Sequence, residues 1–386
     1  MYLFNIRMHM NKYLLFLLLA AGFAACQPGS KEQKDDKGAD STAIPGQATA
    51  SPYYYLRLKG TVGEQPVTMH LVKTGPSIFR GYYCYDKVGA PIDIWGSPEY
   101  EQQVTLYENS RGDDEITFKG KLDPETGFSG TWRGGGTSYP FTLKPDFDGA
   151  IRLDVFYARD STPLLPGREQ SPTGTATNSI LWPAAANNER MADFIKSAIV
   201  NGNSTPAPQQ FVKRNIDSFL TAYKGSIAGM DTSGLNDETM NASWNWTSDA
   251  DMKVVWNQYP LLVLEYAGYE FTGGAHGNGG ASYQVLDLDR QKVLKVADVF
   301  KGNYKTALTR ELGLAFRKAY RMPNGESLQQ MLMVDKIEPN DNFILTNKGV
   351  VFSYTPYEIG AYALGQISLF VPYERIREVL KEDYSK

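Results

Sequence analysis

Short runs of alternating apolar and polar residues fill the stretch from Tyr53 to about Leu143. Apolar positions two apart, as in residues 67–71, recur between turn residues such as Gly, Pro, Asn and Asp. Alternation of this kind, with turn signals about every 8 to 12 residues, is typical of antiparallel strands. We therefore predict an all-β domain over 51–148, a meander of roughly eight strands that forms a barrel or a sandwich.

Helical spacing of apolar residues appears farther along the chain. Stretches with a period of about 3.6 residues are 191–199, 206–223, 304–319 and 376–380. Thr205 and Pro206 offer a cap and a first-turn proline to the second helix, and Gly225 is expected to end it.

Further strands are expected among these helices. Alternating or β-branched runs are 151–157, 254–255, 261–264, 285–288, 343–345, 350–352 and 367–371, with a polar connection at 161–178. Helices and strands are segregated without strict βαβ alternation, which favours an α+β domain over 149–386. We expect an antiparallel sheet with three to four helices there, so the whole chain is α+β.

The first 25 residues are predicted to be a signal peptide. The apolar run Tyr13–Ala21 is much shorter than the roughly 20 residues that span a bilayer core, so the run indicates a removable signal. Small residues stand directly before Cys26 and resemble the lipobox of bacterial lipoproteins, in which the cysteine is lipidated and becomes the first mature residue. The alternative is an ordinary cysteine beside a cleavage site. With Cys26 lipidated, Cys84 alone remains, so no intrachain disulfide is expected.

Residues 26–50 are predicted to be a flexible tether. They are rich in Gln, Gly, Ser, Ala, Pro and charge, with Ile44 as a large apolar residue, so they cannot offset the entropy of ordering. The run Gln33–Lys37 resembles the acidic export signal of Bacteroidota surface lipoproteins, although it starts seven residues after Cys26. The alternative is a solvated charge cluster. We expect an outer membrane lipoprotein on the periplasmic or cell-surface face, held to the membrane by its lipid.

The charge balance narrows the class of partner. Lys and Arg number 39 against 43 Asp and Glu, a formal charge of −4 that becomes −6 when Arg7 and Lys12 leave with the signal peptide. A nucleic-acid partner is not expected, because it needs a basic surface, whereas a cationic partner suits this chain. No metal site is predicted, since the histidines are His9, His70 and His276 and His9 is removed. P-loop and Rossmann glycine patterns are missing, so no cofactor is expected.

Two long motifs carry a family resemblance. The first spans residues 266–300 and contains FTGGAHGN (271–278), and the second is FSYTPYEIGAYALG (352–365) followed by VPY. Together they resemble the RsiV-like domain of unknown function, over roughly residues 150–386. That domain is the exported half of a lysozyme-sensing anti-sigma factor, and its upstream portion is similar to an accessory domain of some peptidoglycan deacetylases. The sigma-binding segment, the spanning helix and a deacetylase catalytic domain are missing, so we expect no sigma-factor control.

The two motifs supply the candidate binding loops. Their candidate residues are Gly273, Gly274, His276, Gly277, Asn278, Tyr354, Tyr357, Glu358 and Tyr362. Glycines allow a positive φ and close backbone approach, and successive N–H groups can hold an anion, while His276 would contact a carboxylate or a sugar hydroxyl. The alternative is a tight turn tied down by a structural His276. Trp244 and Trp246 are candidate surface aromatics, expected to share one strand face.

The leading hypothesis is a non-catalytic, lipid-anchored binding protein of the cell envelope. By resemblance, its C-terminal domain recognises a lysozyme-like muramidase or peptidoglycan. No catalytic residues are assigned, because no G-x-S-x-G elbow is present and nothing points to a carboxylate pair. Two alternatives stay open: a glycan-acting enzyme that uses His276, and a carrier of a small lipophile in the β domain. Tyrosines expected to pack between strands are Tyr53, Tyr54, Tyr55, Tyr82, Tyr83 and Tyr85.

Overall fold

The computed structural model describes residues 52–109, 114–168, 170–202, 206–228 and 243–384. The predicted signal peptide, Cys26 and nearly all of the tether lie outside these residues. From Tyr53 onward the chain forms one compact unit. Within the described residues, no helix is long and apolar enough to cross a membrane.

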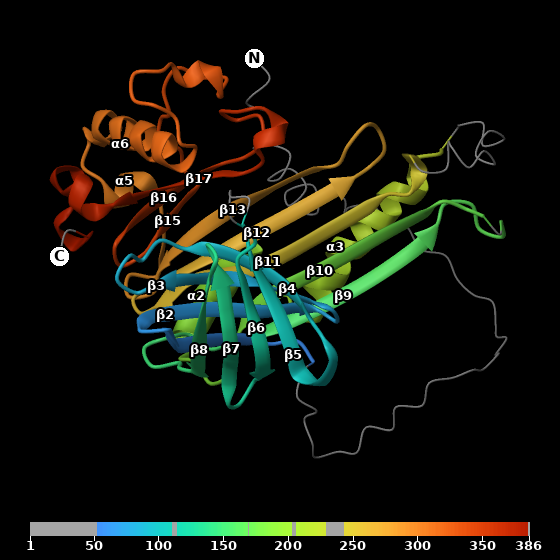
Figure 1. Ribbon diagram of the computed structural model, residues 1–386. Helices are drawn as coiled ribbons and strands as arrows, with labels where there is room; N and C mark the ends of the chain where they lie inside the picture. The colour runs from blue at the N-terminus through green and yellow to red at the C-terminus, as the bar shows by residue number, and fades with distance from the viewer. Residues whose placement is uncertain (1–51, 110–113, 169, 203–205, 229–242, 385–386) are drawn as a thin grey trace. The chain divides into compact units, whose positions relative to one another are not determined.

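Eight antiparallel strands close into a barrel in the first part of this unit (Figure 1). They are β1 (Tyr55–Val62), β2 (Gln65–Gly75), β3 (Ile78–Tyr85), β4 (Ile92–Pro98), β5 (Gln103–Glu108), β6 (Thr117–Asp123), β7 (Gly127–Gly134) and β8 (Thr137–Pro145). Each strand pairs with the next, and β1 closes on β8 with Val62 opposite Phe141. Of the two predicted architectures, the barrel is the one observed.

The barrel interior is filled by every second side chain, as the alternating pattern predicts. Fully buried residues of this core include Leu58, Val67, Met69, Leu71, Ile94, Leu106, Phe118 and Phe128. Tyr83 packs edge-on against Phe118 in the same core, whereas Tyr82 points outward to a different core under the sheet. The prediction that these tyrosines pack in the protein interior is confirmed for Tyr82 and Tyr83.

A six-stranded sheet follows, in the order β14-β13-β12-β11-β10-β9. Its strands are β9 (Leu153–Pro163), β10 (Thr173–Pro183), β11 (Thr247–Gln258), β12 (Leu261–Phe271), β13 (Asn278–Asp287) and β14 (Lys292–Leu294). One pair departs from the expected antiparallel arrangement, because β10 and β11 run parallel with Thr175 opposite Thr247. The helices α2 (Glu189–Val200) and α3 (Pro208–Gly225) lie between β10 and β11 in the chain, and such a crossover brings the next strand back in the same direction.

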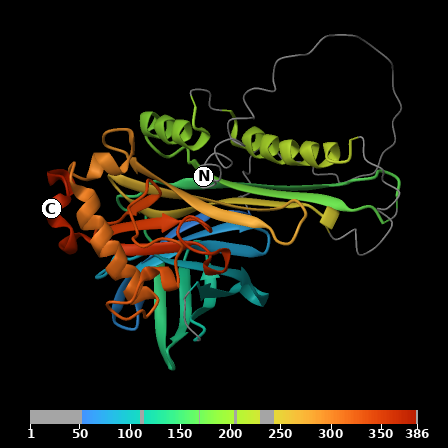
Figure 2. The same ribbon diagram turned by 90° about the horizontal axis from the view of Figure 1, so that it is seen from above.

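The two faces of this sheet are covered differently (Figure 2). One face packs against α2 and α3, whose buried stripes include Ile195 and Ile199 in α2 and Val212 and Ile216 in α3. The other face contacts strands β2 and β3 of the barrel and the C-terminal part of the chain. The sheet therefore lies between the two helices and the barrel.

The C-terminal part combines helices with a three-stranded antiparallel sheet. Its elements are α5 (Val296–Val299), α6 (Tyr304–Ala319), β15 (Phe343–Leu345), β16 (Gly349–Tyr354) and β17 (Ile367–Pro372). Leu308, Leu312 and Phe316 bury the predicted stripe of α6. With α2, α3, α5 and α6 described, the expected three to four helices are present.

Three local predictions are wrong. The connection placed at 161–178 is half strand, because β9 and β10 form a long hairpin whose loop spans only 164–172. Helix α3 begins at Pro208 after Ala207, so Pro206 precedes the helix, and Thr205 lies outside the described residues. The helix expected at 376–380 is a series of 3₁₀ turns, which the short spacing between apolar residues equally permits.

Candidate functional site

The two motif loops meet at one end of the six-stranded sheet. The first connects β12 to β13, and the second follows β16. The His276 ring stacks on Tyr362 with centroids 4.3 Å apart, and Tyr357 lies 5.7 Å from Tyr362. The Tyr362 hydroxyl donates a hydrogen bond to the Gly277 carbonyl over 2.9 Å. Residues about 85 positions apart in the chain thus form one ring cluster, which brings together candidate residues of both predicted loops.

Tyr269 extends this cluster, although it was not among the predicted site residues. A Cβ placed on Gly277 would lie 2.3 Å from the Tyr269 hydroxyl, so the ring lies directly over this glycine. The Tyr269 side chain is 43% exposed and Tyr357 is 38% exposed, large fractions for aromatic residues. We name Tyr269, His276, Tyr357 and Tyr362 the aromatic platform.

Tyr357 holds a backbone conformation that is unfavourable for its residue type. Its φ is +68°, in the left-handed region where a Cβ is crowded. The turn around it is fixed by a hydrogen bond from the Tyr357 N–H to the Gly360 carbonyl and by burial of Ile359. The loop therefore holds the exposed Tyr357 ring in place although its backbone is strained. Strained backbone conformations of this kind cluster at ligand-binding sites.

Tyr354 and Glu358 support the second loop from within. The buried Tyr354 hydroxyl donates to the Glu338 carbonyl over 2.8 Å. Glu358 accepts from the Thr355 backbone N–H at 3.0 Å and from the Asn340 amide at 2.8 Å. The hydrogen bonds of these two predicted binding residues thus hold the loop together.

Specific hydrogen bonds also join the two loops. Gln366 both accepts from the Ala281 N–H and donates to the Ala281 carbonyl, at 3.1 and 3.0 Å. Asn342 donates to the same carbonyl over 3.0 Å. Ala281 lies in β13, just after the FTGGAHGN loop (271–278), so the second loop is tied to this strand.

The glycines of the first motif have distinct roles. Gly273 and Gly274 have φ values of +92° and +90°, which a side chain would strain. A Cβ on Gly273 would also lie 2.9 Å from the Ser243 carbonyl oxygen. Asn278 is exposed and pairs with Glu270 at the start of β13. The motif is therefore a tight turn, as the structural alternative predicted, and it also carries the exposed His276.

Trp244 and Trp246 do not share a strand face, contrary to the prediction. Strand β11 begins only at Thr247, and both tryptophans precede it. They are half-buried around the fully buried Tyr223, whose ring lies 5.5 Å from that of Trp246. Their apolar surface is thus partly used in packing α3 against the sheet end.

A buried charge cluster joins the barrel to the sheet. The Lys253 ammonium on β11 lies 2.7 Å from Asp93 of β4 and 2.9 Å from Glu265 of β12. The Tyr82 hydroxyl on β3 donates a hydrogen bond to Glu265. Lys253 and Glu265 are almost fully buried, so these contacts are shielded from solvent.

Burial dominates the electrostatics of this cluster. It raises the pKa of Glu265 and of Asp251, which pairs with Arg80 over 3.1 Å. Burial alone would lower the pKa of Lys253, but the surrounding carboxylates outweigh it and raise that pKa. A weak signal for this cluster is present in the sequence, because Asp249, Asp251 and Lys253 alternate along one strand face. Such a pattern is usually typical of a solvated face.

The platform has the chemistry of a binding surface. The His276 Nδ1 lies 2.9 Å from the Gly277 carbonyl, which can only accept, so this nitrogen carries the proton. The two described contacts of the ring are with the Gly277 carbonyl and the Tyr362 ring. No three His, Cys, Asp or Glu residues of the described segments gather where a metal ion could sit. Exposed rings and hydroxyls can stack on and hydrogen-bond to sugars.

Comparison with known proteins finds two matching segments. Residues 175–279 match a family described as deacetylase PdaC, and residues 297–374 match a family described as a protein of unknown function, DUF3298. The chain therefore contains a segment similar to PdaC followed by one similar to DUF3298, which we call the PdaC segment and the DUF3298 segment. The platform is built across both, since His276 belongs to the first and Tyr357 and Tyr362 belong to the second.

Individual proteins are also similar to parts of this chain. The peptidoglycan-N-acetylmuramic acid deacetylase PdaC of Bacillus subtilis (strain 168) is 22% identical over 138 residues, which are 35% of this chain and 30% of that protein. The chain thus spans less than a third of that curated relative. A DUF3298 family crystal structure from Bacteroides fragilis has a TM-score of 0.55 at 25% identity and covers 61% of this chain and 96% of its own. One from Pseudomonas aeruginosa PAO1 has a TM-score of 0.42 at 20% identity, over 62% and 98%.

Proposed function

We propose that this chain is a non-catalytic cell-envelope protein that binds the glycan strands of peptidoglycan through the aromatic platform. The observation that carries the proposal is the joining of exposed rings from two segments, with Tyr357 held in a strained conformation at the surface. The PdaC segment adds support, because the deacetylase that it resembles acts, by its name, on peptidoglycan.

The geometry favours binding over catalysis. Sugar rings present C–H faces that stack on aromatic rings, and their hydroxyls can pair with the tyrosine hydroxyls and the His276 imidazole. A general acid or base must lie within hydrogen-bond reach of the proton that it transfers and is commonly oriented by a further polar side chain. The described contacts of His276 are a carbonyl and a tyrosine ring, so they supply orientation and stacking.

The proposal includes an envelope location. The small residues before Cys26 support lipidation there, and the polar composition of 26–50 supports a tether that would let the folded unit reach the cell wall. The proposed setting is the outer membrane, on its periplasmic or cell-surface face.

The test is co-sedimentation of the chain, without its predicted signal peptide, with purified peptidoglycan sacculi. Tyr357→Ala and Tyr362→Ala are expected to weaken binding about tenfold, equivalent to about 1.4 kcal/mol. Tyr259→Ala is the matched control, since Tyr259 is 47% exposed in the turn between β11 and β12, at the opposite ends of these strands. Equal binding by all four proteins, or none by wild type, would reject the proposal.

A second ligand is favoured by one observation, the net charge of −6 on the chain without residues 1–25. An acidic surface attracts basic proteins and speeds their encounter, and lysozyme-like muramidases are expected to be basic. Titration with lysozyme at low and moderate salt tests this candidate. Saturable binding that weakens with salt supports it, and absence of binding at low salt refutes it.

A further inference from the structure

The outer wall of the barrel carries a second candidate site, outside both matching segments. Strands β2 and β3 pack against the sheet, so in a closed eight-stranded barrel β5, β6 and β7 lie on the opposite wall. This wall holds two neighbouring grooves, of about 290 and 360 Å³. Lys119 and Lys121 on β6, and Thr131 and Ser129 on β7, line one groove each, and such positions two apart share one strand face.

A stacked aromatic pair stands at the edge of the first groove. The rings of Trp95 on β4 and Tyr107 on β5 are 5.0 Å apart and inclined by 26°. Trp95 is 49% exposed although it is the largest apolar side chain type. Cross-strand pairing continues the row from Tyr107 to Thr117 and then to Arg133. Neighbouring strands lie about 4.8 Å apart, so the row runs straight across the wall.

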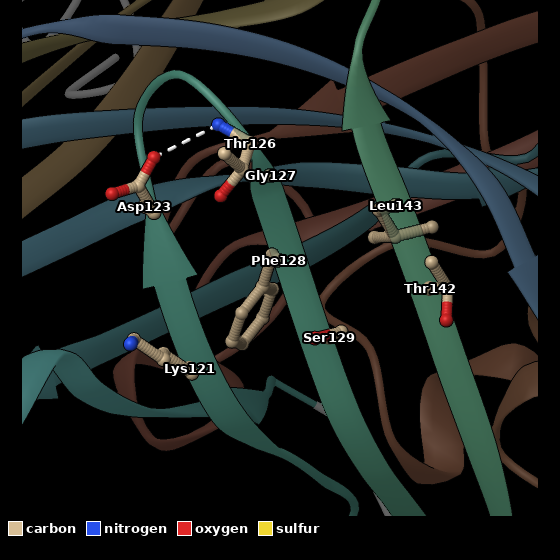
Figure 3. A pocket seen from close by; sticks show the side chains of 8 residues that line it. All are labelled: Lys121, Asp123, Thr126, Gly127, Phe128, Ser129, Thr142 and Leu143. Carbon is tan, nitrogen blue, oxygen red and sulfur yellow. Dashed lines mark hydrogen bonds between the residues drawn. The ribbon is translucent and has the colours of Figure 1, made fainter.

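Some charged side chains of the grooves form hydrogen bonds or ion pairs within the protein, and others form no described ion pair. Glu99 accepts from the Thr105 hydroxyl at 2.6 Å and pairs with Lys119 at 3.2 Å. In the second groove, Asp123 accepts the backbone N–H groups of its own turn, as Figure 3 shows for Thr126. Among the described ion pairs, none involves Lys121, Arg133 or the exposed Glu115, which lines the first groove together with Arg133. The two cations are therefore available to carboxylates of a ligand, and Glu115 is available to its hydroxyls.

The pattern differs from that of a protein interface. A protein interface usually has an apolar centre and a polar rim, whereas here the rings lie at one edge and the grooves are lined mainly by hydroxyl and charged groups. Rings stack on sugar faces, hydroxyls pair with sugar hydroxyls, and a guanidinium binds a carboxylate in bidentate fashion. We propose that this wall is a binding site for an acidic oligosaccharide, stacked on Trp95 and Tyr107 with its carboxylates at Arg133 and Lys121.

The test is calorimetric titration of the whole chain, without its predicted signal peptide, with hexagalacturonate and with the neutral chitohexaose. We expect hexagalacturonate to bind at least tenfold more tightly, with an affinity that falls as salt is raised. Trp95→Ala should abolish this binding, and Arg133→Gln should reduce it to the level of chitohexaose. Tyr139→Ala, which removes another exposed barrel ring outside both grooves, should bind as wild type does.

The same titration on a Tyr357→Ala, Tyr362→Ala double variant separates this site from the platform. Hexagalacturonate binding should persist there, whatever happens to binding of sacculi. Equal affinities for the two oligosaccharides, no saturable binding of hexagalacturonate, or full binding by Trp95→Ala would each overturn the proposal. Circular dichroism of the variants checks that these exposed substitutions leave the fold intact.

Discussion

At the scale of single residues, Tyr357 adopts a backbone conformation that lowers the stability of the folded protein. Its positive φ costs about 1 to 2 kcal/mol for a residue with a Cβ. Glycine at this position would remove that cost, although it would lose more entropy on folding. The sequence could not reveal this feature, because a tyrosine in a Pro-Tyr-Glu-Ile-Gly run carries no sign of a left-handed backbone.

We predict that Tyr357→Gly melts at the same temperature as wild type or above it, while it binds sacculi as weakly as Tyr357→Ala. Relief of the strained φ offsets the lost contacts in the glycine variant, and alanine retains the strain. Thermal melts followed by circular dichroism measure the difference. A glycine variant less stable than the alanine variant would contradict this interpretation of the loop.

His70 is a second informative residue. It is buried on β2 and lies 2.8 Å from the Tyr55 hydroxyl, which in turn accepts from Asn257 of β11 over 3.2 Å. Burial, with a smaller effect of Arg57, lowers the pKa of His70 from 6.5 to about 3. The folded protein therefore keeps the imidazole neutral where the unfolded chain protonates it. Its contribution to stability is complete above pH 6.5 and is lost as the pH falls toward 3.

Below pH 6.5, we expect this group to remove about 1.4 kcal/mol of unfolding free energy per pH unit. His70→Gln keeps a hydrogen-bonding side chain but cannot titrate, so its stability should fall less between pH 6.5 and 4.5. Urea unfolding of both proteins at the two pH values gives the comparison. Identical pH dependence in the two proteins would show that the folded state accepts the proton.

At the scale of elements, the alternating and helical periods predicted most of the secondary structure. The barrel strands, α6 and the end of α3 at Gly225 follow directly from apolar spacing. The parallel pairing of β10 with β11 was not predictable from local patterns, because it depends on where two helices return the chain. The burial of charged residues on β11 was not predictable either, because local patterns do not show that Lys253 faces the barrel and not solvent.

The Lys253 cluster is expected to hold the barrel and the sheet together. Lys253→Met leaves Glu265 and Asp93 without their cation, which costs about 3 to 5 kcal/mol for a buried pair. The control Lys196→Met breaks an exposed pair with Asp193 and should cost less than about 1 kcal/mol. Urea unfolding at pH 7 measures both.

The loss of unfolding free energy caused by Lys253→Met should be smaller at pH 5 than at pH 7. Burial already raises the pKa of Glu265, so the carboxylate left behind takes up a proton more readily as the pH falls, and its neutral form tolerates burial. A loss of unfolding free energy that is equal at the two pH values, or as small as that of Lys196→Met, would mean that the cluster is solvated. It would then not stabilise the contact between the barrel and the sheet.

At the scale of the whole molecule, different stretches of the chain build the platform and the barrel. The PdaC and DUF3298 segments together build the platform, and the barrel lies outside both. The sequence alone predicted both motif loops as candidate binding loops and named His276, Tyr357 and Tyr362 among their residues. It could not separate these from Tyr354 and Glu358, because burial and hydrogen bonding within the loop depend on Glu338 and Asn340 far from the motif.

The measurement that tests the central claim most directly is calorimetric titration of a soluble muropeptide carrying its glycan into wild type and the Tyr357→Ala, Tyr362→Ala double variant. We predict saturable binding by wild type and a loss of at least tenfold in the double variant, with unchanged folding by circular dichroism. Equal affinity of the two proteins for the muropeptide, or no binding by wild type, would contradict the account.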